Sequence, residues 1–293
     1  MNTVYKYCCP RGVEILESLE IKVTQPNRFN DPFEFYPRMI STNPLRWAQQ
    51  ILKTPGVIER IYQTRTIAGS WRGSLEEFRR HMSDHIEEEA RSLVSHVPQA
   101  IGEVRARVVE HASKTFGILC LSNKRDSILM WGHYADKHRG IVIGFDSSND
   151  MFQANAKSSR LGESDSTVIM MGLHPVEYGN ERVVYDTSWF PTDPQMTQFE
   201  QQIFFSKSKD WIYEEEVRQC FALDSLVARL LDDKSPGYFL PVSPAAVVSV
   251  SLGAKFNMDT AERVRAALKR SCFSHVVFDQ ASLDEREFAL VFN

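Results

Sequence analysis

The sequence predicts an α+β protein in which strand-like segments near both ends of the chain enclose a long helical stretch. The first observation is an alternating run at residues 4–7, followed by a helix-like segment at 12–19 and a second strand-like run at 21–24. The second is the segment 44–113, which is rich in Glu, Arg and His and places apolar side chains at helical spacing. The third is a closing series of strands and one helix between 247 and 292. Together they indicate a strand-rich core with a helical insertion.

The remaining elements follow from the same patterns. Short apolar or alternating runs predict strands at 115–121, 140–145, 176–185, 212–222, 247–252, 275–279 and 288–292. Helical spacing predicts helices at 127–137, 198–206, 226–231 and 259–270. Residues 146–171 are rich in Ser, Asn and Asp and predict a long loop. Asn30-Asp31-Pro32 predicts a sharp turn, because proline disfavours a helical conformation at the residue before it.

Composition limits the classes of protein that this chain can belong to. With 293 residues, 43% of them hydrophobic, the chain can bury a large core, and we expect one domain, 1–293, with 44–113 inserted. A net charge of -4 argues against a protein that depends on a broad basic face. The chain has no leader-like start and no long apolar run, so we expect a cytoplasmic protein that does not bind membranes. The five cysteines lack paired zinc-ligand spacing, and we interpret them as reduced thiols.

The segment 130–145 carries an aromatic motif. On a helix, Trp131, Tyr134 and His138 would share one face, and such a face can stack on a planar ring and hydrogen-bond to it. His133 lies in the same motif and is a further candidate for ligand binding. The alternative is that Trp131 and Tyr134 belong to the core.

A charged motif follows at residues 207–218. In an extended chain Glu214, Glu216 and Arg218 would project from one face, and crowded carboxylates beside a guanidinium suit acid-base or cation-stabilising chemistry. The alternative is a solvated charged edge strand. Trp211 and Tyr213 flank the charges and favour partial burial.

A weaker motif combines Tyr5-Lys6-Tyr7 with the turn at Asn30 and Asp31. A lysine between two aromatic residues can meet a phosphate or a ribose, and Asn30 or Asp31 can close the site. The alternative is that Lys6 is a solvent-facing residue of a strand.

These motifs together resemble the bacterial family catalogued as domain of unknown function 2971. The resemblance rests on four ordered stretches, 5–7, 29–34, 120–140 and 207–218. It spans the chain apart from the helical insertion and the loop after Asp146.

The order of the motifs is also similar to the plan of the ADP-ribosyltransferase superfamily. This resemblance implies a mixed, mainly antiparallel sheet. It places Lys6 on the first core strand, Tyr134 on a following element and Glu216 on a later strand, with Glu214 giving a Glu-x-Glu spacing. Lys6 stands where many members have His or Arg.

The resemblance implies an NAD-dependent ADP-ribosyltransferase or NAD glycohydrolase, such as a toxin or a phage-defence effector, acting on nucleic acid, protein or NAD itself. NAD would be a substrate, and Glu216 with Glu214 would stabilise positive charge on its ribose. The residues expected to bind NAD are Lys6, Tyr7, Trp131, His133, Tyr134, Lys207 and Arg218. Those expected to bind the acceptor are Asn30, Asp31 and Tyr213.

Two other classes of function stay open. A metal-dependent nuclease or hydrolase would use the carboxylates of Asp31, Glu34, Glu214 and Glu216 together with Lys207. A non-catalytic module would use the aromatic face to recognise a nucleotide or a partner protein.

Overall fold

The computed structural model describes residues 3–153, 172–189 and 194–293. The chain divides into two compact units. The first contains Met1–Phe35, Glu110–Glu181 and Gln201–Asn293, and the second contains Tyr36–Val109 and Arg182–Glu200. No helix among the described residues is both long enough and apolar enough to cross a membrane.

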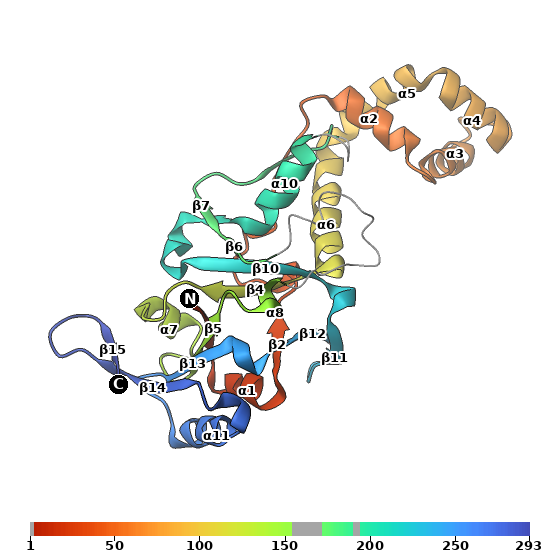
Figure 1. Cartoon of the computed structure of the whole chain (residues 1–293). Coiled ribbons are helices and arrows are strands. Elements are labelled where there is room, and N and C mark those ends of the chain that lie inside the picture. The colour runs from red at the N-terminus through yellow and green to blue at the C-terminus, as the bar shows by residue number, and fades with distance from the viewer. Residues whose placement is uncertain (1–2, 154–171, 190–193) are drawn as a thin grey trace. The chain divides into compact units, whose positions relative to one another are not determined.

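The first unit is built on an eight-stranded sheet with the order β15-β14-β13-β5-β1-β4-β10-β6 (Figure 1). Neighbouring strands are antiparallel except β13 and β14, which are parallel. The strands are β1 Thr3–Cys8, β4 Phe116–Ser122, β5 Ile141–Asp146, β6 His174–Pro175, β10 Glu216–Ala222, β13 Val247–Leu252, β14 Val277–Leu283 and β15 Leu290–Phe292. The prediction of a mixed, mainly antiparallel sheet in an α+β protein is confirmed.

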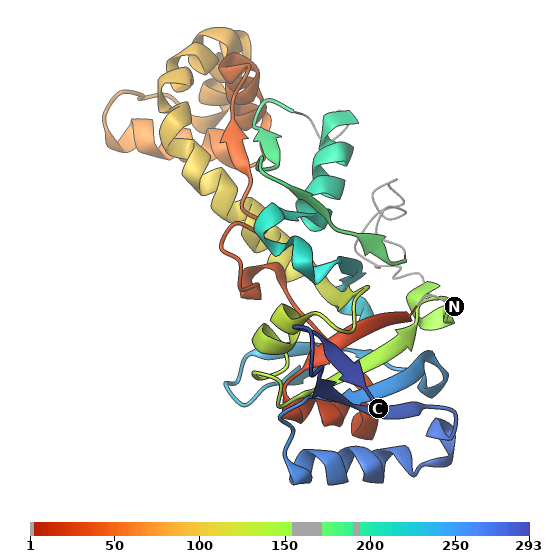
Figure 2. The same ribbon diagram turned by 90° about the vertical axis from the view of Figure 1, so that its left-hand side faces the viewer.

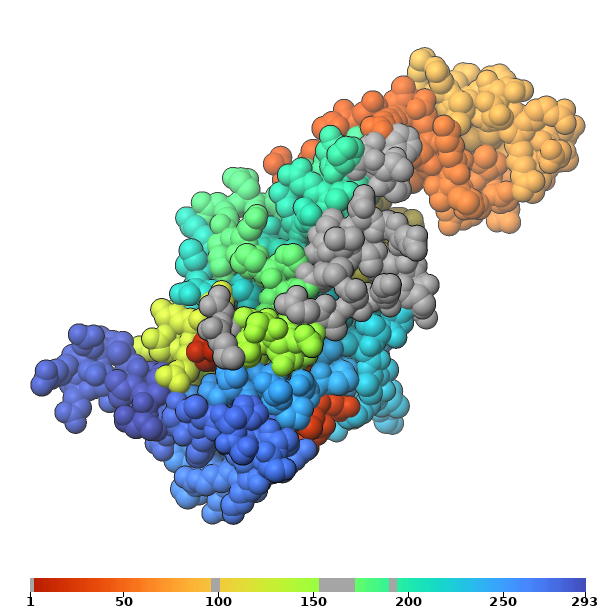
Figure 3. All heavy atoms as spheres, in the orientation of Figure 1, coloured from red at the N-terminus to blue at the C-terminus, as the bar shows by residue number. Residues whose placement is uncertain are grey.

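The two α-helices α1 (Glu14–Ser18) and α11 (Met258–Leu268) pack against each other in the first unit (Figures 1 and 2). An ion pair of 2.8 Å joins Arg263 Nη2 of α11 to Glu17 Oε2 of α1. The apolar sides of both helices join the strands in one hydrophobic core. β14 and β15 form a hairpin at the edge of the sheet opposite β6. The hairpin extends from the surface as the dark blue region of Figure 3, and Phe288 in it is fully exposed.

A smaller antiparallel sheet of the first unit joins β11 (Val227–Leu230), β12 (Pro236–Pro241) and β2 (Glu20–Val23). The helix predicted at 226–231 is therefore wrong. A short apolar run fits the repeat of a helix as well as that of a strand, and here pairing with β12 makes the segment a strand. The strand predicted at 176–185 is also not continuous, because it is split between β7 (Glu177–Gly179) and β8 (Val184–Asp186).

The remaining elements complete both units. β7 pairs with β9 (Ser206–Ser208), and β8 pairs with β3 (Arg38–Ile40). Further helices are α8 Asp150–Gln153 and α10 Pro194–Phe205, and the short 3-10 helices are η1 Pro10–Val13, η2 Pro26–Arg28, η3 Val94–His96, η4 Lys209–Glu214, η5 Leu223–Ser225, η6 Pro244–Ala246 and η7 Ser271–Phe273. Most of the loop predicted at 146–171 lies outside the described residues, which resume at 172.

The predicted helical stretch 44–113 is helical in the structure. It contains α2 Pro44–Lys53, α3 Val57–Ile67, α4 Leu75–Asp84, α5 Ile86–Leu93 and α6 Val97–Thr115. Ser74 begins α4 with a capping box, in which its hydroxyl accepts from the Glu77 backbone N–H and the Glu77 carboxylate accepts from the Ser74 N–H. The second unit has a core of its own, formed by Trp47, Ala48, Leu52, Phe78, Met82 and Ala90.

The helix predicted at 127–137 is shorter than expected. α7 covers only Ile128–His133, and Asp136, Lys137 and His138 follow with φ angles of 47°, 57° and 68°. These left-handed residues turn the chain so that Gly140 N–H donates to Ala135 O at 2.9 Å. The shared face predicted for Trp131, Tyr134 and His138 is wrong, because the helix ends before the last two.

Gly140 is required by the close approach of this turn to β1. A Cβ atom at Gly140 would lie 1.9 Å from the backbone oxygen of Cys8, whereas one at Gly132 in α7 would have nothing within 4 Å. We expect Gly140→Ala to lower the free energy of unfolding by about 1–3 kcal/mol or more, since the backbone must move. Gly132→Ala should raise it by roughly 0.5–1 kcal/mol, because alanine favours the helix. Urea denaturation measures both, and equal stability of the two variants would contradict this account.

Candidate functional site

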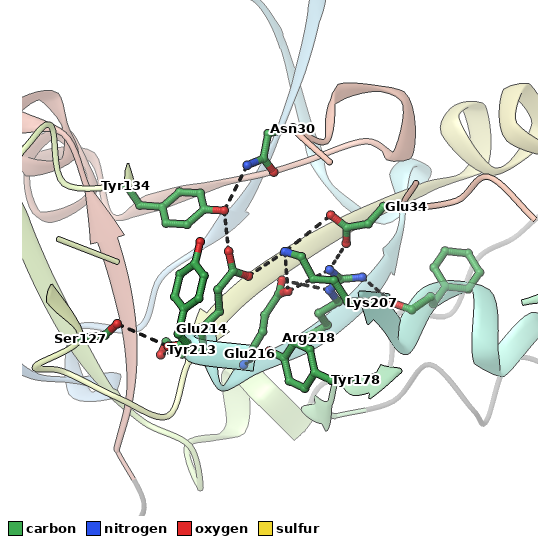
Figure 4. A network of polar contacts seen from close by, with 12 residues as sticks. Asn30, Glu34, Ser127, Tyr134, Tyr178, Lys207, Tyr213, Glu214, Glu216 and Arg218 are labelled. Carbon is green, nitrogen blue, oxygen red and sulfur yellow. Dashed lines mark hydrogen bonds and ion pairs between the residues drawn. The ribbon is translucent and has the colours of Figure 1, made fainter. Parts of the chain in front are cut away.

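A cluster of buried charges lies at the start of β10 in the first unit (Figure 4). It contains three carboxylates, from Glu34, Glu214 and Glu216, and two cations, from Lys207 and Arg218. None of the five residues is more than 8% exposed. Burial of this many charges is costly unless each has partners, so their geometry decides the chemistry of the site.

Arg218 is the centre of the cluster and is fully buried. Its Nε and Nη2 donate to the two carboxylate oxygens of Glu216, each at 2.9 Å. Nη2 also donates to Glu34, and Nη1 donates to the backbone oxygen of Phe204 at 2.9 Å. A planar guanidinium suits this fork, so Arg218 ties β10 to the loop of Glu34 and to the end of α10.

Lys207, on β9, forms the second centre. Its Nζ lies 2.6 Å from Glu214 Oε2, 3.3 Å from Glu216 Oε2 and 3.6 Å from Glu34 Oε2. Lys207 thus bridges all three carboxylates. Its ammonium also lies 4.8 Å from the centre of the Trp211 ring, a cation–π contact.

Glu214 connects the cluster to the surface. The Tyr134 hydroxyl donates to Glu214 Oε1 at 2.6 Å, and Asn30 Nδ2 donates to the Tyr134 hydroxyl at 3.2 Å. Asn30 is exposed, whereas Glu214 is buried. A chain of hydrogen bonds therefore runs from an exposed amide to Lys207.

The local backbone explains how two glutamates on either side of Glu215 both face inward. Residues Lys209–Glu214 form the 3-10 helix η4, and β10 begins only at Glu216. The strand predicted from residue 212 is therefore wrong for its first part. Glu215 adopts a left-handed conformation with φ of 42° and is exposed, and this reversal returns Glu216 to the same cluster as Glu214.

Burial and partners shift the pKa values of the carboxylates in opposite directions. Burial raises the pKa of Glu216, but Arg218 and Lys207 outweigh it and hold the value at about 2. Burial raises the pKa of Glu214 above 4.5 despite Lys207 and Tyr134, and burial also raises that of Glu34 despite Arg218. Lys207 has a raised pKa because the three carboxylates outweigh its burial. The cluster thus contains one firmly ionised carboxylate and two that hold a proton more readily.

A cavity of about 270 Å³ opens above Glu214 and Glu216. Aromatic side chains form much of its wall, namely Tyr5, Tyr7, Phe29 and Tyr134. Lys6 and Arg28 add positive charge, and the Lys6 ammonium donates to the backbone oxygen of Cys120 at 3.0 Å. The cavity combines aromatic, basic and carboxylate groups, which suits a ligand with a planar ring, a sugar and a phosphate.

The structure brings together most of the residues that the sequence analysis selected. Seven of them line the cavity: Lys6, Tyr7, Asn30, Tyr134, Lys207, Glu214 and Glu216. Arg218 contacts two of the carboxylates from beneath and does not line the cavity. Asp31 and Tyr213 line a neighbouring hollow instead.

Trp131 and His133 were expected to bind NAD, but neither lines the cavity. The Trp131 ring is fully buried, donates from Nε1 to Arg125 O at 2.9 Å, and stacks on His138. This places Trp131 in the core, as the alternative interpretation held. His133 is exposed, and its ring lies 6.1 Å from that of Tyr213.

Several contributors were missed as site residues for NAD chemistry, among them Tyr5 and Arg28 at the cavity wall. Glu34 was selected only for the metal-dependent alternative, although it binds both cations of the cluster. Phe29 packs on Arg218 with its ring centre 5.2 Å from the guanidinium carbon, and the Tyr178 hydroxyl accepts from Glu216 N at 2.8 Å. Phe29 and Glu34 belong to the motif around Asn30 and Asp31, which is the signal that could have identified them.

Removal of Arg218 tests the cluster as a stabilising element. Arg218→Met leaves the carboxylates of Glu34 and Glu216 buried without their main cation, so we expect the free energy of unfolding to fall by roughly 3–5 kcal/mol. The matched control is Arg229→Met, which removes an ion pair to Glu20 from a side chain that is 51% exposed and should cost roughly 0–1 kcal/mol. Chemical denaturation compares the two, and a similar loss in both would refute a special role for Arg218.

The depressed pKa of Glu216 predicts a pH dependence of stability. Because its folded-state pKa of about 2 lies below that of the unfolded chain, ionised Glu216 stabilises the fold above about pH 5. This contribution, on the order of 3 kcal/mol, should be lost as the pH falls from about 5 to 2. We expect the difference in unfolding free energy between the wild type and Glu216→Gln to shrink over this range. A constant difference would contradict the assignment.

The comparisons with known proteins concern the same region. No curated protein and no solved structure matches the chain. Residues 130–219 match the family model described as "Protein of unknown function (DUF2971)". The matched segment contains Tyr134, Lys207, Glu214, Glu216 and Arg218, so it covers most of the buried cluster. The match supports the resemblance of this chain to the domain of unknown function 2971 family.

Proposed function

We propose that the cavity binds NAD and that the protein cleaves the bond between its ribose and nicotinamide, passing ADP-ribose to an acceptor or to water. The observation that carries this proposal is the pair Glu214 and Glu216 at the cavity, with pKa values shifted in opposite directions. Paired carboxylates beside the reacting bond are used by many enzymes that cleave glycosidic bonds, because the transition state carries positive charge on the sugar.

The reaction needs negative charge near the ribose. When the bond from C1′ to the nicotinamide nitrogen breaks, the electron pair leaves with nicotinamide and neutralises its ring, while positive charge develops on C1′ and the ring oxygen. A nucleophilic N–H or O–H group of the acceptor, or water, then bonds to C1′ and gives its proton to a base. A fixed carboxylate beside the ribose lowers the energy of the charged state.

The two glutamates would contribute differently. Glu216 accepts from Arg218, Lys207 and the Cys120 thiol, which occupies nearly all of its acceptor directions. Among the described residues, Tyr134 and Lys207 are the two that donate to the Glu214 carboxylate, so it has room for a ribose hydroxyl. Glu214 would therefore touch the substrate, and Glu216 would supply a fixed negative charge behind it.

The other groups of the cavity suit the remaining parts of NAD. Tyr134 and Phe29 offer rings that can stack on nicotinamide, and Lys6 and Arg28 offer charges for the pyrophosphate. A volume of about 270 Å³ is below the roughly 300–1,000 Å³ typical of pockets that enclose a drug-sized ligand. The cavity would therefore enclose the reacting nucleoside, while the adenosine part lies outside it.

The charge pairing favours this function over metal-dependent hydrolysis. Lys207 and Arg218 pair with Glu34, Glu214 and Glu216, and no group of three or more His, Cys, Asp or Glu side chains among the described residues is placed to hold a metal ion. Asp31, the fourth carboxylate of that alternative, lines the neighbouring hollow.

The test is release of nicotinamide from labelled NAD by the purified protein, with and without a chelator. Glu214→Gln should lower the rate by about 100-fold or more, because it removes charge that stabilises the transition state. The matched control is Glu215→Gln, which changes the exposed neighbour in the same run and should leave the rate near that of the wild type. The wild-type rate should also fall as the pH drops through the raised pKa of Glu214.

Circular dichroism and NAD affinity of each variant separate loss of folding from loss of chemistry. Tyr134→Phe offers a milder change, since it keeps the ring and removes only the hydroxyl, which donates to Glu214 and accepts from Asn30. No nicotinamide release by the wild type, with basic and nucleic-acid acceptors present, would refute the proposal. Release that stops on chelation would favour the metal-dependent alternative.

A further inference from the structure

A second hollow, which we call the acidic recess, has a volume of about 340 Å³. Its wall contains two aspartates, Asp31 and Asp210, and three aromatic residues, Phe33, Trp211 and Tyr213. Phe33 is 61% exposed, and the rings of Trp211 and Tyr213 lie 6.1 Å apart. The recess is therefore both negatively charged and aromatic.

The acidic recess adjoins the cavity through two shared segments. Asn30 lines the cavity and the next residue, Asp31, lines the recess. In the same way, Glu214 lines the cavity and the preceding residue, Tyr213, lines the recess. The walls of the acidic recess and of the cavity therefore come from adjacent residues of the same two segments.

Asp31 gives an independent reason to expect a ligand. Asp31 is only 4% exposed, and its Oδ1 accepts from Phe33 N at 2.8 Å. Its Oδ2 is buried and has no hydrogen-bond partner among the described residues. A buried carboxylate oxygen without a donor is unfavourable, so a ligand that brings an N–H group would be bound with a net gain.

The other walls define what kind of ligand fits. Cations bind favourably over aromatic faces, and Trp211 already makes such a contact with Lys207 on the cluster side. Two aspartates attract a guanidinium or ammonium group and repel a phosphate. The chemistry of the acidic recess thus suits a basic side chain and opposes a nucleic-acid backbone.

We propose that the acidic recess binds a basic side chain of a protein acceptor, with its guanidinium or ammonium group between Asp31, Asp210 and the aromatic rings. This inference rests on the proposed function, because it names the class of acceptor that receives ADP-ribose at the neighbouring cavity. Of the acceptors that the sequence analysis left open, namely nucleic acid, protein and NAD itself, this inference favours protein.

Binding can be measured without NAD. A fluorescently labelled arginine-rich peptide is titrated with the full chain, in parallel with a glutamate-rich peptide and a single-stranded oligonucleotide of the same length. The arginine-rich peptide should bind most tightly. The double variant Asp31→Asn and Asp210→Asn should weaken it by about tenfold or more, since charged hydrogen bonds to the ligand are lost. The control Asp232→Asn, a similar change at a side chain that is 95% exposed, should bind like the wild type.

Turnover provides a second measurement. With labelled NAD present, the ratio of peptide labelling to nicotinamide release should fall in the double variant. Equal peptide affinity of the wild type and the double variant would overturn the inference, and so would tighter binding of the oligonucleotide than of the peptide. If the wild type releases no nicotinamide while peptide binding still depends on both aspartates, the proposed function fails and the basic-ligand site in the recess stands.

Discussion

The ion pairs of Arg218 are the interaction on which the rest of the site depends. A fully buried guanidinium on β10 is tolerable only because two carboxylates and a backbone carbonyl surround it. These partners come from β10 itself, from the loop that carries Glu34, and from the end of α10. The ion pairs therefore fix the position of this loop, and the loop carries Phe29 and Asn30 to the wall of the cavity.

The cluster has three carboxylates for two cations, and this imbalance leaves the carboxylates unequally supported. Arg218 binds Glu34 and Glu216, so Lys207 alone supports Glu214, assisted by the neutral hydroxyl of Tyr134. Of the two carboxylates that line the cavity, Glu214 has the weaker cationic support and accepts fewer hydrogen bonds than Glu216. Positive charge that develops in the cavity would offset the excess negative charge of the cluster, and it would do so most directly at Glu214. For this reason we assign the contact with the substrate to Glu214.

Local patterns predicted most of the sheet and the helical stretch, because both have strong periodicity. They also selected Glu214, Glu216, Lys207 and Tyr134 as residues that meet. They failed where tertiary contacts decide the conformation. The left-handed φ of Glu215 and the strand pairing of 227–230 leave no local signal, and the contact of Glu34 with Arg218 joins residues 184 positions apart. Trp131 is a similar case. The sequence showed its aromatic motif but could not show that the ring points into the core.

The cavity and the acidic recess are connected through Lys207. On one side its ammonium binds Glu214, which lines the cavity, and on the other it contacts the ring of Trp211, which lines the recess. A cation bound near Trp211 would repel the Lys207 charge and so weaken its support of Glu214, whereas positive charge on the ribose would draw Glu214 toward the cavity. Both effects favour a Glu214 carboxylate that is free to face the substrate. The same lysine would thus make the carboxylate more available when the acceptor is already in place.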